Sequence, residues 1–277
     1  MNSDVKIAFR EIGEGPTLIL LHGYAGSVLH WDPVVQDLKR NFRLVIPNLS
    51  HLFMGKNPLT FSQQIAHFAD FVDKNFPNQK LNFAGISYGA SLVWGYSLRY
   101  PGNVEKTIFI NPMPPAPVDS FQISILKSFF KLALTPKSIY LILATPIGRY
   151  FIRRAAKVFR SERAEHWDRF DDLNSRKLRF VSQVIHNFSY ILKNEDWEDW
   201  KLQLAEWSHS TLLIYDEKDP LFEAQTHPDF KRLIRCHNVR IIQGAGHIAT
   251  QTSGVEIARL IHEFLLDIKG SSTAAGF

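Results

Sequence analysis

Cysteine is nearly absent from the chain, which has one such residue, Cys236, in 277. A single thiol cannot form an internal disulfide, so the fold has to be stable without one, as is usual in a reducing compartment. We predict that Cys236 is a packed or exposed thiol with no catalytic role. The spacings of histidine and cysteine give no zinc site, and we expect neither a metal nor a cofactor.

Long apolar runs are absent as well. Residues 1–6 are polar and lack the apolar centre of a signal peptide. The most apolar internal stretch, 139–152, is interrupted by Pro146 and Arg149 and is too short to span a bilayer. We therefore expect a soluble, cytoplasmic protein.

A strong excess of one charge is also missing, because 32 basic and 27 acidic residues leave a net charge of only +5. No nucleic-acid-binding motif accompanies this balance, so we predict no nucleic-acid partner. Hydrophobic residues make up 45% of the chain, which is enough for one large α/β domain or for a core with an inserted subdomain.

What is present is an alternation of apolar strands with amphipathic helices. Strands are predicted at 5–10, 17–21, 42–46, in a short run that begins at 81, and at 104–110, 211–215 and 239–242, with helices at 31–40, 61–76, 92–100 and 254–269. This alternation is typical of an α/β fold with a mostly parallel central sheet and helices on both faces. The loops after such strands meet at one edge of the sheet, where ligands bind. They contain Gly23, Asn48, Ser87, Asn111 and Asp219.

Between 113 and 207 the pattern is helical only. Helical spacing recurs near 120–134, 136–145, 147–160, 162–170 and 175–192. We therefore predict a core made of 1–112 and 208–277, and a helical cap, or lid, made of 113–207.

A G-x-S-x-G pattern stands between the run that begins at 81 and the helix that follows it. The sequence is Gly85-Ile86-Ser87-Tyr88-Gly89. In a strand–turn–helix context this pattern predicts a nucleophile elbow, a strained corner at which only small neighbours fit beside an exposed serine. An ordinary loop with small residues is the alternative.

Two later loops offer partners for Ser87. His247 lies in a glycine-bearing loop after the last strand, and histidine is the usual base for a serine. Asp216, Glu217 and Asp219 follow another buried strand, and one of them could orient the imidazole. A structural histidine and a solvated acidic turn are the alternatives, but the order serine, acid, histidine along the chain is that of one hydrolase fold.

On these residues the chain resembles the α/β-hydrolase fold family with an inserted helical lid, from the His22-Gly23 loop to the last helix. The resemblance implies that Ser87 is the nucleophile and that His247 is the base. It implies Asp219, directly before Pro220, as the acid, with Asp216 as the second candidate. The serine argues against haloalkane dehalogenases and epoxide hydrolases of this fold, which use an aspartate nucleophile.

The resemblance also implies an oxyanion hole made by the backbone N–H groups of Tyr24 and Tyr88. His22 is expected to buttress that loop. The stretch 47–55 departs from the family pattern, because both glycines and the aspartate that relatives commonly carry are replaced. We therefore expect pocket-lining side chains from His51, Phe53 and Met54.

The predicted cap is basic and rich in apolar residues. Between 119 and 160 the only acid is Asp119, whereas eight residues are basic: Lys127, Lys131, Lys137, Arg149, Arg153, Arg154, Lys157 and Arg160. Its apolar face either roofs the active site or lies weakly on an anionic membrane surface. Both readings predict an apolar and aromatic pocket that takes acyl or aryl groups.

The predicted function is that of a serine carboxylic-ester hydrolase, an esterase or small-acyl lipase, acting on a small apolar acyl or aryl ester. The alternatives with the same triad are a carbon–carbon (diketone) hydrolase, a thioesterase, an amidase and an acyltransferase. A weakly catalytic ligand-binding protein of the same fold is an alternative of another class. The sequence favours no particular oligomeric state.

Overall fold

A computed structural model of the chain describes residues 7–53, 55, 57–122, 124–132, 134–158 and 174–267. The helix predicted at 162–170 and the first residues of the strand predicted at 5–10 lie outside these ranges. In the described residues, no helix is both long and apolar enough to cross a bilayer.

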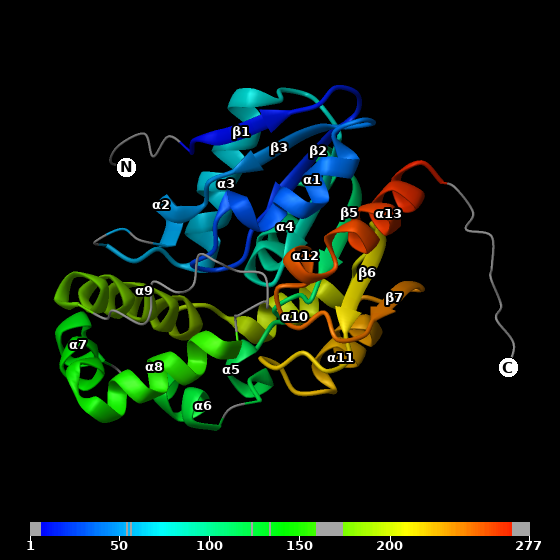
Figure 1. The fold of residues 1–277 in the computed structure, drawn as a ribbon. Helices are drawn as coiled ribbons and strands as arrows, with labels where there is room; N and C mark the ends of the chain where they lie inside the picture. Colours follow the sequence, from blue (N-terminus) through cyan, green and yellow to red (C-terminus); the bar gives the residue numbers. More distant parts are fainter. Residues whose placement is uncertain are drawn as a thin grey trace, which may run out of the picture.

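The centre of the molecule is a seven-stranded sheet with the order β1-β3-β2-β4-β5-β6-β7 (Figure 1). The strands are β1 (Phe9–Ile12), β2 (Thr17–Leu21), β3 (Arg43–Pro47), β4 (Leu81–Ile86), β5 (Val104–Ile110), β6 (Ser210–Asp216) and β7 (Asn238–Ile242). Only β1 runs antiparallel to its neighbour, and every other pairing is parallel. The mostly parallel sheet predicted from the sequence is confirmed.

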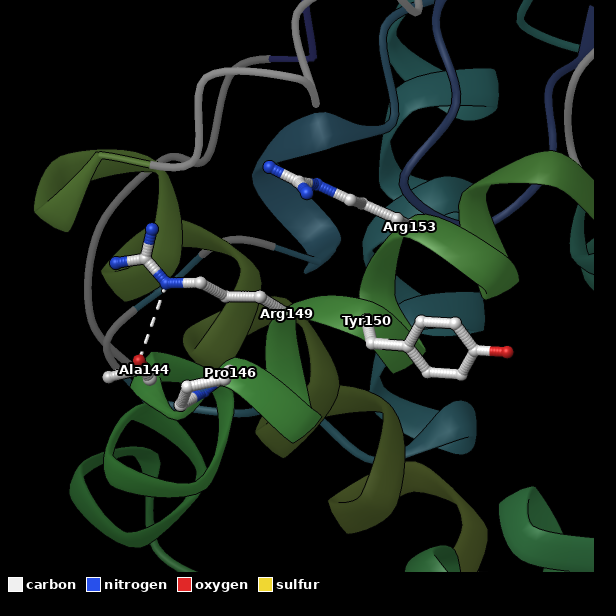
Figure 2. Close-up of a pocket in the computed structure, with 5 residues that line it drawn as sticks. All are labelled: Ala144, Pro146, Arg149, Tyr150 and Arg153. Carbon is white, nitrogen blue, oxygen red and sulfur yellow. Dashed lines mark hydrogen bonds between the residues drawn. The ribbon is translucent and has the colours of Figure 1, made fainter.

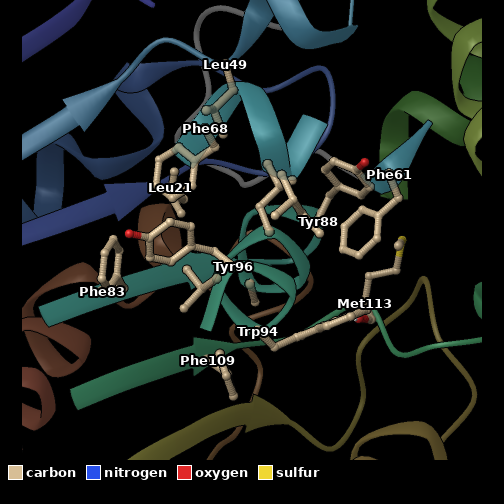
Figure 3. Packing of buried hydrophobic residues seen from close by; sticks show 14 of the residues in the cluster. Leu21, Leu49, Phe61, Phe68, Phe83, Tyr88, Trp94, Tyr96, Phe109 and Met113 are labelled. Atoms are coloured by element: carbon tan, nitrogen blue, oxygen red, sulfur yellow. Dashed lines mark hydrogen bonds between the residues drawn. The ribbon is translucent and has the colours of Figure 1, made fainter. Parts of the chain in front are cut away.

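Helices cover both faces of the sheet, which explains why its strands are apolar at consecutive positions. Leu18 and Leu20 of β2 pack with α1 (Asp32–Leu38) and α13 (Gly254–Leu265). Ile19 and Leu21 point to the other face, toward α3 (Phe61–Asn75) and α4 (Tyr88–Arg99). The second face is aromatic, and Figure 3 shows Phe61, Phe68, Tyr88, Trp94 and Tyr96 among its packed rings.

Local signals set most boundaries, and several helices differ from prediction. Thr60 and Gln63 form a capping box at the start of α3. The helix predicted at 92–100 begins earlier, at Tyr88, because Ser87 already turns the chain into it. A 3-10 turn, η1 (Val28–Trp31), precedes α1, and η2 (Pro101–Asn103) follows α4. The short helices α2 (Ser50–Phe53), α11 (Thr226–Leu233) and α12 (Ala249–Thr252) were not predicted.

Six helices lie between β5 and β6 in the described residues. They are α5 (Pro117–Ser120), α6 (Ser124–Lys131), α7 (Pro136–Ala144), α8 (Pro146–Val158), α9 (Ser175–Lys193) and α10 (Trp197–Ala205). Figure 1 shows α6 to α9 together beside the sheet, on the side of its β-strand carboxyl ends. The last of the six, α10, packs on the sheet layer instead, because Trp200 contacts Trp94 of α4. The division of the chain at 113 and 207 stays a prediction.

The helical insert is fastened to the loops around the carboxyl edge of the sheet. The amide of Asn187 on α9 donates to the carbonyls of Phe53 (2.7 Å) and Gly55 (3.0 Å). The hydroxyl of Tyr24 donates to the carbonyl of Val184, also on α9, at 2.9 Å. The insert therefore sits directly over the edge where the sequence predicts the active site.

Candidate active site

Ser87 stands at the corner between β4 and α4 with a positive φ of 54°. Backbone crowding explains the glycines on either side. A Cβ at Gly85 would lie 2.5 Å from the backbone of residues 89 and 90, and a Cβ at Gly89 would lie 2.3 Å from the carbonyl oxygen of Leu21. No larger residue fits at either position without moving the backbone, so the elbow geometry follows from these two glycines.

The side chain of Ser87 meets that of His247, which follows β7. Oγ of Ser87 lies 2.9 Å from Nε2 of His247, and Nδ1 of the same ring lies 2.8 Å from Oδ2 of Asp219. All three residues are buried, with at most 8% of any of them exposed. The structure thus brings together the three side chains that the sequence suggested, in a hydrogen-bonded row.

Asp216 makes a different set of contacts from Asp219. Its carboxylate accepts from the backbone N–H of Gly246 (2.6 Å) and of Lys218 (2.9 Å), whereas the carboxylate of Asp219 lies against the imidazole of His247. Asn111, at the end of β5, binds the same loop through the carbonyls of Gly246 (2.9 Å) and His247 (3.0 Å). Asp216 and Asn111 therefore hold the histidine loop in place.

A second imidazole, His227 on α11, also reaches Asp219. Its Nε2 lies 3.3 Å from Oδ2 of Asp219, and only 2% of the residue is exposed. Sequence reasoning missed His227 because the helix that carries it was not predicted. The one signal in the sequence was that His227 follows Asp219 by eight residues.

Two histidines and one carboxylate near the site have shifted pKa values. Burial opposes ionisation of Asp219, but the neighbouring His247 and His227 outweigh it and hold the pKa of that carboxyl well below its usual range. Burial lowers the pKa of His22 to about 4. Burial, together with the nearby His247, lowers the pKa of His30 to about 4 as well. These two rings are therefore neutral at pH 7.

His22 holds the loop that precedes Tyr24. Its Nε2 accepts from the backbone N–H of Leu49 at 3.0 Å, so its Nδ1 carries the proton and donates to the carbonyl of Gly23 at 2.9 Å. The neutral ring thereby links the His22-Gly23 loop to the stretch after β3, in agreement with the expected buttress.

The residues expected to form an oxyanion hole lie on two sides of Ser87. Tyr88 is the first residue of α4, where N–H groups have no acceptor within the helix. Gly23 approaches Ser87 so closely that an added Cβ would lie 3.3 Å from the Cβ of the serine, and Tyr24 follows it. The phenol of Tyr88 donates to Gln64 at 2.9 Å, and that of Tyr24 is bound by α9 as described above.

The expected lining residues differ in their surroundings. Phe53 is fully buried, with its ring centroid 4.6 Å from that of Tyr24 and 5.4 Å from that of Tyr88. His51, on α2, is exposed. Met54 lies outside the described residues. A role in lining the pocket stays a prediction for all three.

An aromatic wall links the histidine side of the site to the tyrosine side. Phe222 lies edge-on to His247 at 5.4 Å and stacks on Phe121 at 5.7 Å. Phe188 of α9 lies 6.4 Å from Phe121 and 4.5 Å from Tyr24. We call Phe121, Phe188 and Phe222 the aromatic wall. It gives the surroundings of Ser87 an apolar character on the side of the helical insert.

Among the described residues, no group of three or more His, Cys, Asp or Glu side chains is arranged to hold a metal ion. The polar groups of the site are instead a serine hydroxyl, two imidazoles, one carboxylate and main-chain N–H groups. Such a set can transfer a proton from the hydroxyl to the adjacent imidazole and stabilise the charge that results.

Comparisons with known proteins agree with this architecture. The pimeloyl-(acyl-carrier protein) methyl ester esterase of Vibrio campbellii is 28% identical over 109 residues, which are 39% of this chain and 42% of that protein. Epoxide hydrolase 3 of Mus musculus is 22% identical over 129 residues, 43% of this chain and 34% of that protein. The chain thus matches less than half of the length of either relative.

Similarity in structure extends much further than similarity in sequence. A thermophilic esterase from Thermogutta terrifontis superposes with a TM-score of 0.69 at 17% identity, over 94% of this chain and 93% of that one. The family model described as alpha/beta hydrolase fold matches residues 16–250. With the parallel sheet and the elbow on β4, this match shows that the chain belongs to the alpha/beta hydrolase fold family.

Proposed function

We propose that the protein is a serine hydrolase that cleaves carboxylic esters through an acyl-enzyme on Ser87. One observation carries the proposal, namely the row of hydrogen bonds from Ser87 Oγ through His247 to Asp219, at 2.9 and 2.8 Å. The row starts at a serine whose positive φ is typical of a nucleophile elbow. Ser87, His247 and Asp219 are the catalytic residues we propose.

The reaction begins when Ser87 Oγ attacks the ester carbonyl and His247 Nε2 takes the proton of the serine hydroxyl. The N–H groups of Tyr24 and Tyr88 bind the oxyanion that forms. The imidazolium, stabilised by Asp219, gives the proton to the leaving alcohol, and the acyl group stays on Ser87. Water then attacks the acyl-enzyme while His247 again acts as base, which releases the acid and restores the serine.

For the substrate we propose a small apolar acyl or aryl ester. The aromatic wall supports this class, because packed phenyl rings favour apolar groups and offer few partners to sugars or phosphates. The esterase names of the Vibrio and Thermogutta relatives agree with ester chemistry. Diketone, thioester, amide and acyl-transfer reactions use the same groups and remain the alternatives, and binding without turnover is the alternative of another class.

We propose that the helical insert, 113–207, acts as a lid over the site. We also propose that its basic helices make weak contact with an anionic lipid surface. Nucleic acid is not a proposed partner. A cytoplasmic location agrees with the single, buried cysteine.

A fluorophosphonate probe tests the nucleophile, because it reacts covalently with an activated serine. We expect wild type to be labelled and Ser87→Ala to remain unlabelled. Ser97→Ala is the matched control, since Ser97 is a buried serine of α4, the helix that follows Ser87, and its hydroxyl donates to the carbonyl of Val93. Equal labelling of wild type and Ser87→Ala would refute the assignment.

A substrate screen tests the bond that is cleaved. Wild type, Ser87→Ala and Ser97→Ala are each assayed on p-nitrophenyl esters of increasing acyl length, on a thioester and on a diketone. We expect the highest kcat/KM on short acyl or aryl esters, lost only in Ser87→Ala. Labelling by the probe without turnover of any ester would instead favour one of the alternatives.

A further inference from the structure

Large apolar side chains gather on the outside of the helical insert. At the end of α7, Leu141 is 59% and Ile142 is 43% exposed. On the first turns of α8, Ile147, Tyr150 and Phe151 are 71%, 59% and 40% exposed. No other stretch of eleven residues in the described part of the chain exposes as many large apolar side chains. We call these five residues the α7–α8 corner.

The two helices of the corner are in contact with each other. Gly148 allows the start of α8 to touch the end of α7, since a Cβ there would lie 2.1 Å from the carbonyl oxygen of Ile142. Ile147, Tyr150 and Phe151 are spaced three and four residues apart, so they share one face of α8. Figure 1 shows α7 and α8 at the end of the molecule that is distant from α13 and β7.

Basic side chains border this apolar surface. Figure 2 shows Arg149 and Arg153 one turn apart on α8, with Tyr150 pointing away from both guanidinium groups. The two arginines and Tyr150, with Ala144 and Pro146, line a hollow of about 530 Å³. Arg149 uses its Nε to donate to the carbonyl of Ala144 at 3.3 Å.

The sequence from α6 to α8 lacks acidic residues. From 120 to 158 the sequence contains no aspartate or glutamate but seven lysines and arginines. A second copy of the chain would bring like charges together at this surface, which disfavours self-association through it. Nucleic acid would satisfy the charges but would leave the apolar side chains in water.

We propose that the α7–α8 corner docks onto an anionic lipid surface. Its five apolar side chains enter the boundary between headgroups and acyl chains, and Arg149 and Arg153 contact lipid phosphates. This inference rests on the lipid-surface partner proposed above, and it names the part of the insert that makes the contact. Docking there brings the insert that covers Ser87 into contact with the lipid phase.

Vesicle flotation without substrate tests the docking. Wild type is mixed with vesicles of phosphatidylcholine alone, or of phosphatidylcholine with phosphatidylglycerol, at low and at high salt. We expect binding to the anionic vesicles that weakens with salt. The double variant Ile147→Ser/Tyr150→Ser should bind about tenfold more weakly, because it removes apolar groups from the lipid. Arg149→Gln/Arg153→Gln should bind about thirtyfold more weakly, at about 1 kcal/mol per basic residue.

Matched controls separate this surface from a general effect. Leu202→Ser/Val255→Ser removes side chains that are each 71% exposed, as Ile147 is, but lie on α10 and α13. Lys231→Gln/Arg232→Gln removes two exposed charges on α11. Both controls should bind as wild type does.

Three outcomes overturn the inference. The first is that wild type does not bind to anionic vesicles. The second is that the corner variants bind as tightly as the controls. The third is that the corner variants sediment differently from wild type, which would reveal a second copy of the chain on this surface. Turnover of a soluble p-nitrophenyl ester is measured in parallel and should be equal in wild type and corner variants. Ser87→Ala should float as wild type does, so the docking and the proposed chemistry can fail independently.

Discussion

His227 donates to the same carboxylate oxygen of Asp219 that Nδ1 of His247 contacts, at 3.3 Å against 2.8 Å. The ring of His227 is buried between Tyr215 and Phe222, and its other nitrogen has no partner among the described residues. One oxygen of Asp219 therefore contacts two imidazoles. Its other oxygen accepts from the N–H of Leu221 at 2.8 Å.

Removing the second donor should concentrate the charge of Asp219 on His247. We expect His227→Leu to move the acidic limb of the kcat/KM profile to higher pH by about half a unit, the size of one modest hydrogen bond. His227→Gln keeps an N–H at the position of Nε2 and should restore the wild-type limb. The pH profile of ester hydrolysis measures both. If the acidic limb lies at the same pH in His227→Leu and in wild type, His227 contributes only to packing.

The two aspartates should respond differently to loss of charge. Asp219→Asn should lower kcat about 10⁴-fold, because the histidine then loses its orienting carboxylate. Asp216→Asn should instead lower the free energy of unfolding by about 1–3 kcal/mol, since Asp216 holds the N–H of Gly246. Steady-state kinetics and urea unfolding of both variants check this. A larger loss of kcat in the Asp216 variant would reverse the assignment of the acid.

The elbow should tolerate no side chain at its second glycine. In Gly89→Ala the new methyl would lie 2.3 Å from the carbonyl of Leu21, so we expect a loss of about 3 kcal/mol or more in stability and no fluorophosphonate labelling. Gly102→Ala is the control, because a Cβ there meets nothing within 4 Å. It should stay within about 0.5 kcal/mol of wild type.

The aromatic wall should set the length of the acyl group. Phe188→Ala removes the ring between Phe121 and Tyr24 and should shift the preferred p-nitrophenyl ester to a longer chain. Phe180→Ala, on the same helix but 49% exposed, should leave the preference unchanged. The profile of kcat/KM against acyl length measures the shift, and parallel profiles for the two variants would exclude Phe188 from the pocket.

Stability should fall in mild acid because His22 and His30 are buried in the neutral form. An unfolded imidazole takes up a proton near pH 6.5, whereas burial keeps the pKa of each ring at about 4 in the folded protein. The unfolded state therefore binds more protons between pH 6.5 and 4, and each ring costs about 2 kcal/mol of stability between pH 7 and 5. Urea unfolding at both pH values measures the loss. His30→Phe should show a smaller loss, and an unchanged slope would mean that His30 takes up its proton over the same pH range in the folded and unfolded states.

Much of the core could be predicted from local patterns. The run Thr17–Leu21 is apolar at consecutive positions because both faces of β2 are covered, and such runs indicate a parallel sheet. The helix at 61–76 was readable because its apolar residues recur at helical spacing. The short helices were not readable, because four residues, as in α2 and α12, carry no period.

The sequence by itself determined the chemistry on offer: a serine between two glycines, a histidine and an acidic loop after later strands, and an insert without acids from 120 to 158. Only the tertiary structure decided which acid meets the histidine, because Asp216 and Asp219 differ in direction rather than in residue type. It also revealed His227 beside Asp219 and the aromatic wall beside His247. The contact of Asp219 with His247 and the contacts of the aromatic wall join residues that are far apart in the chain, and only folding brings them together.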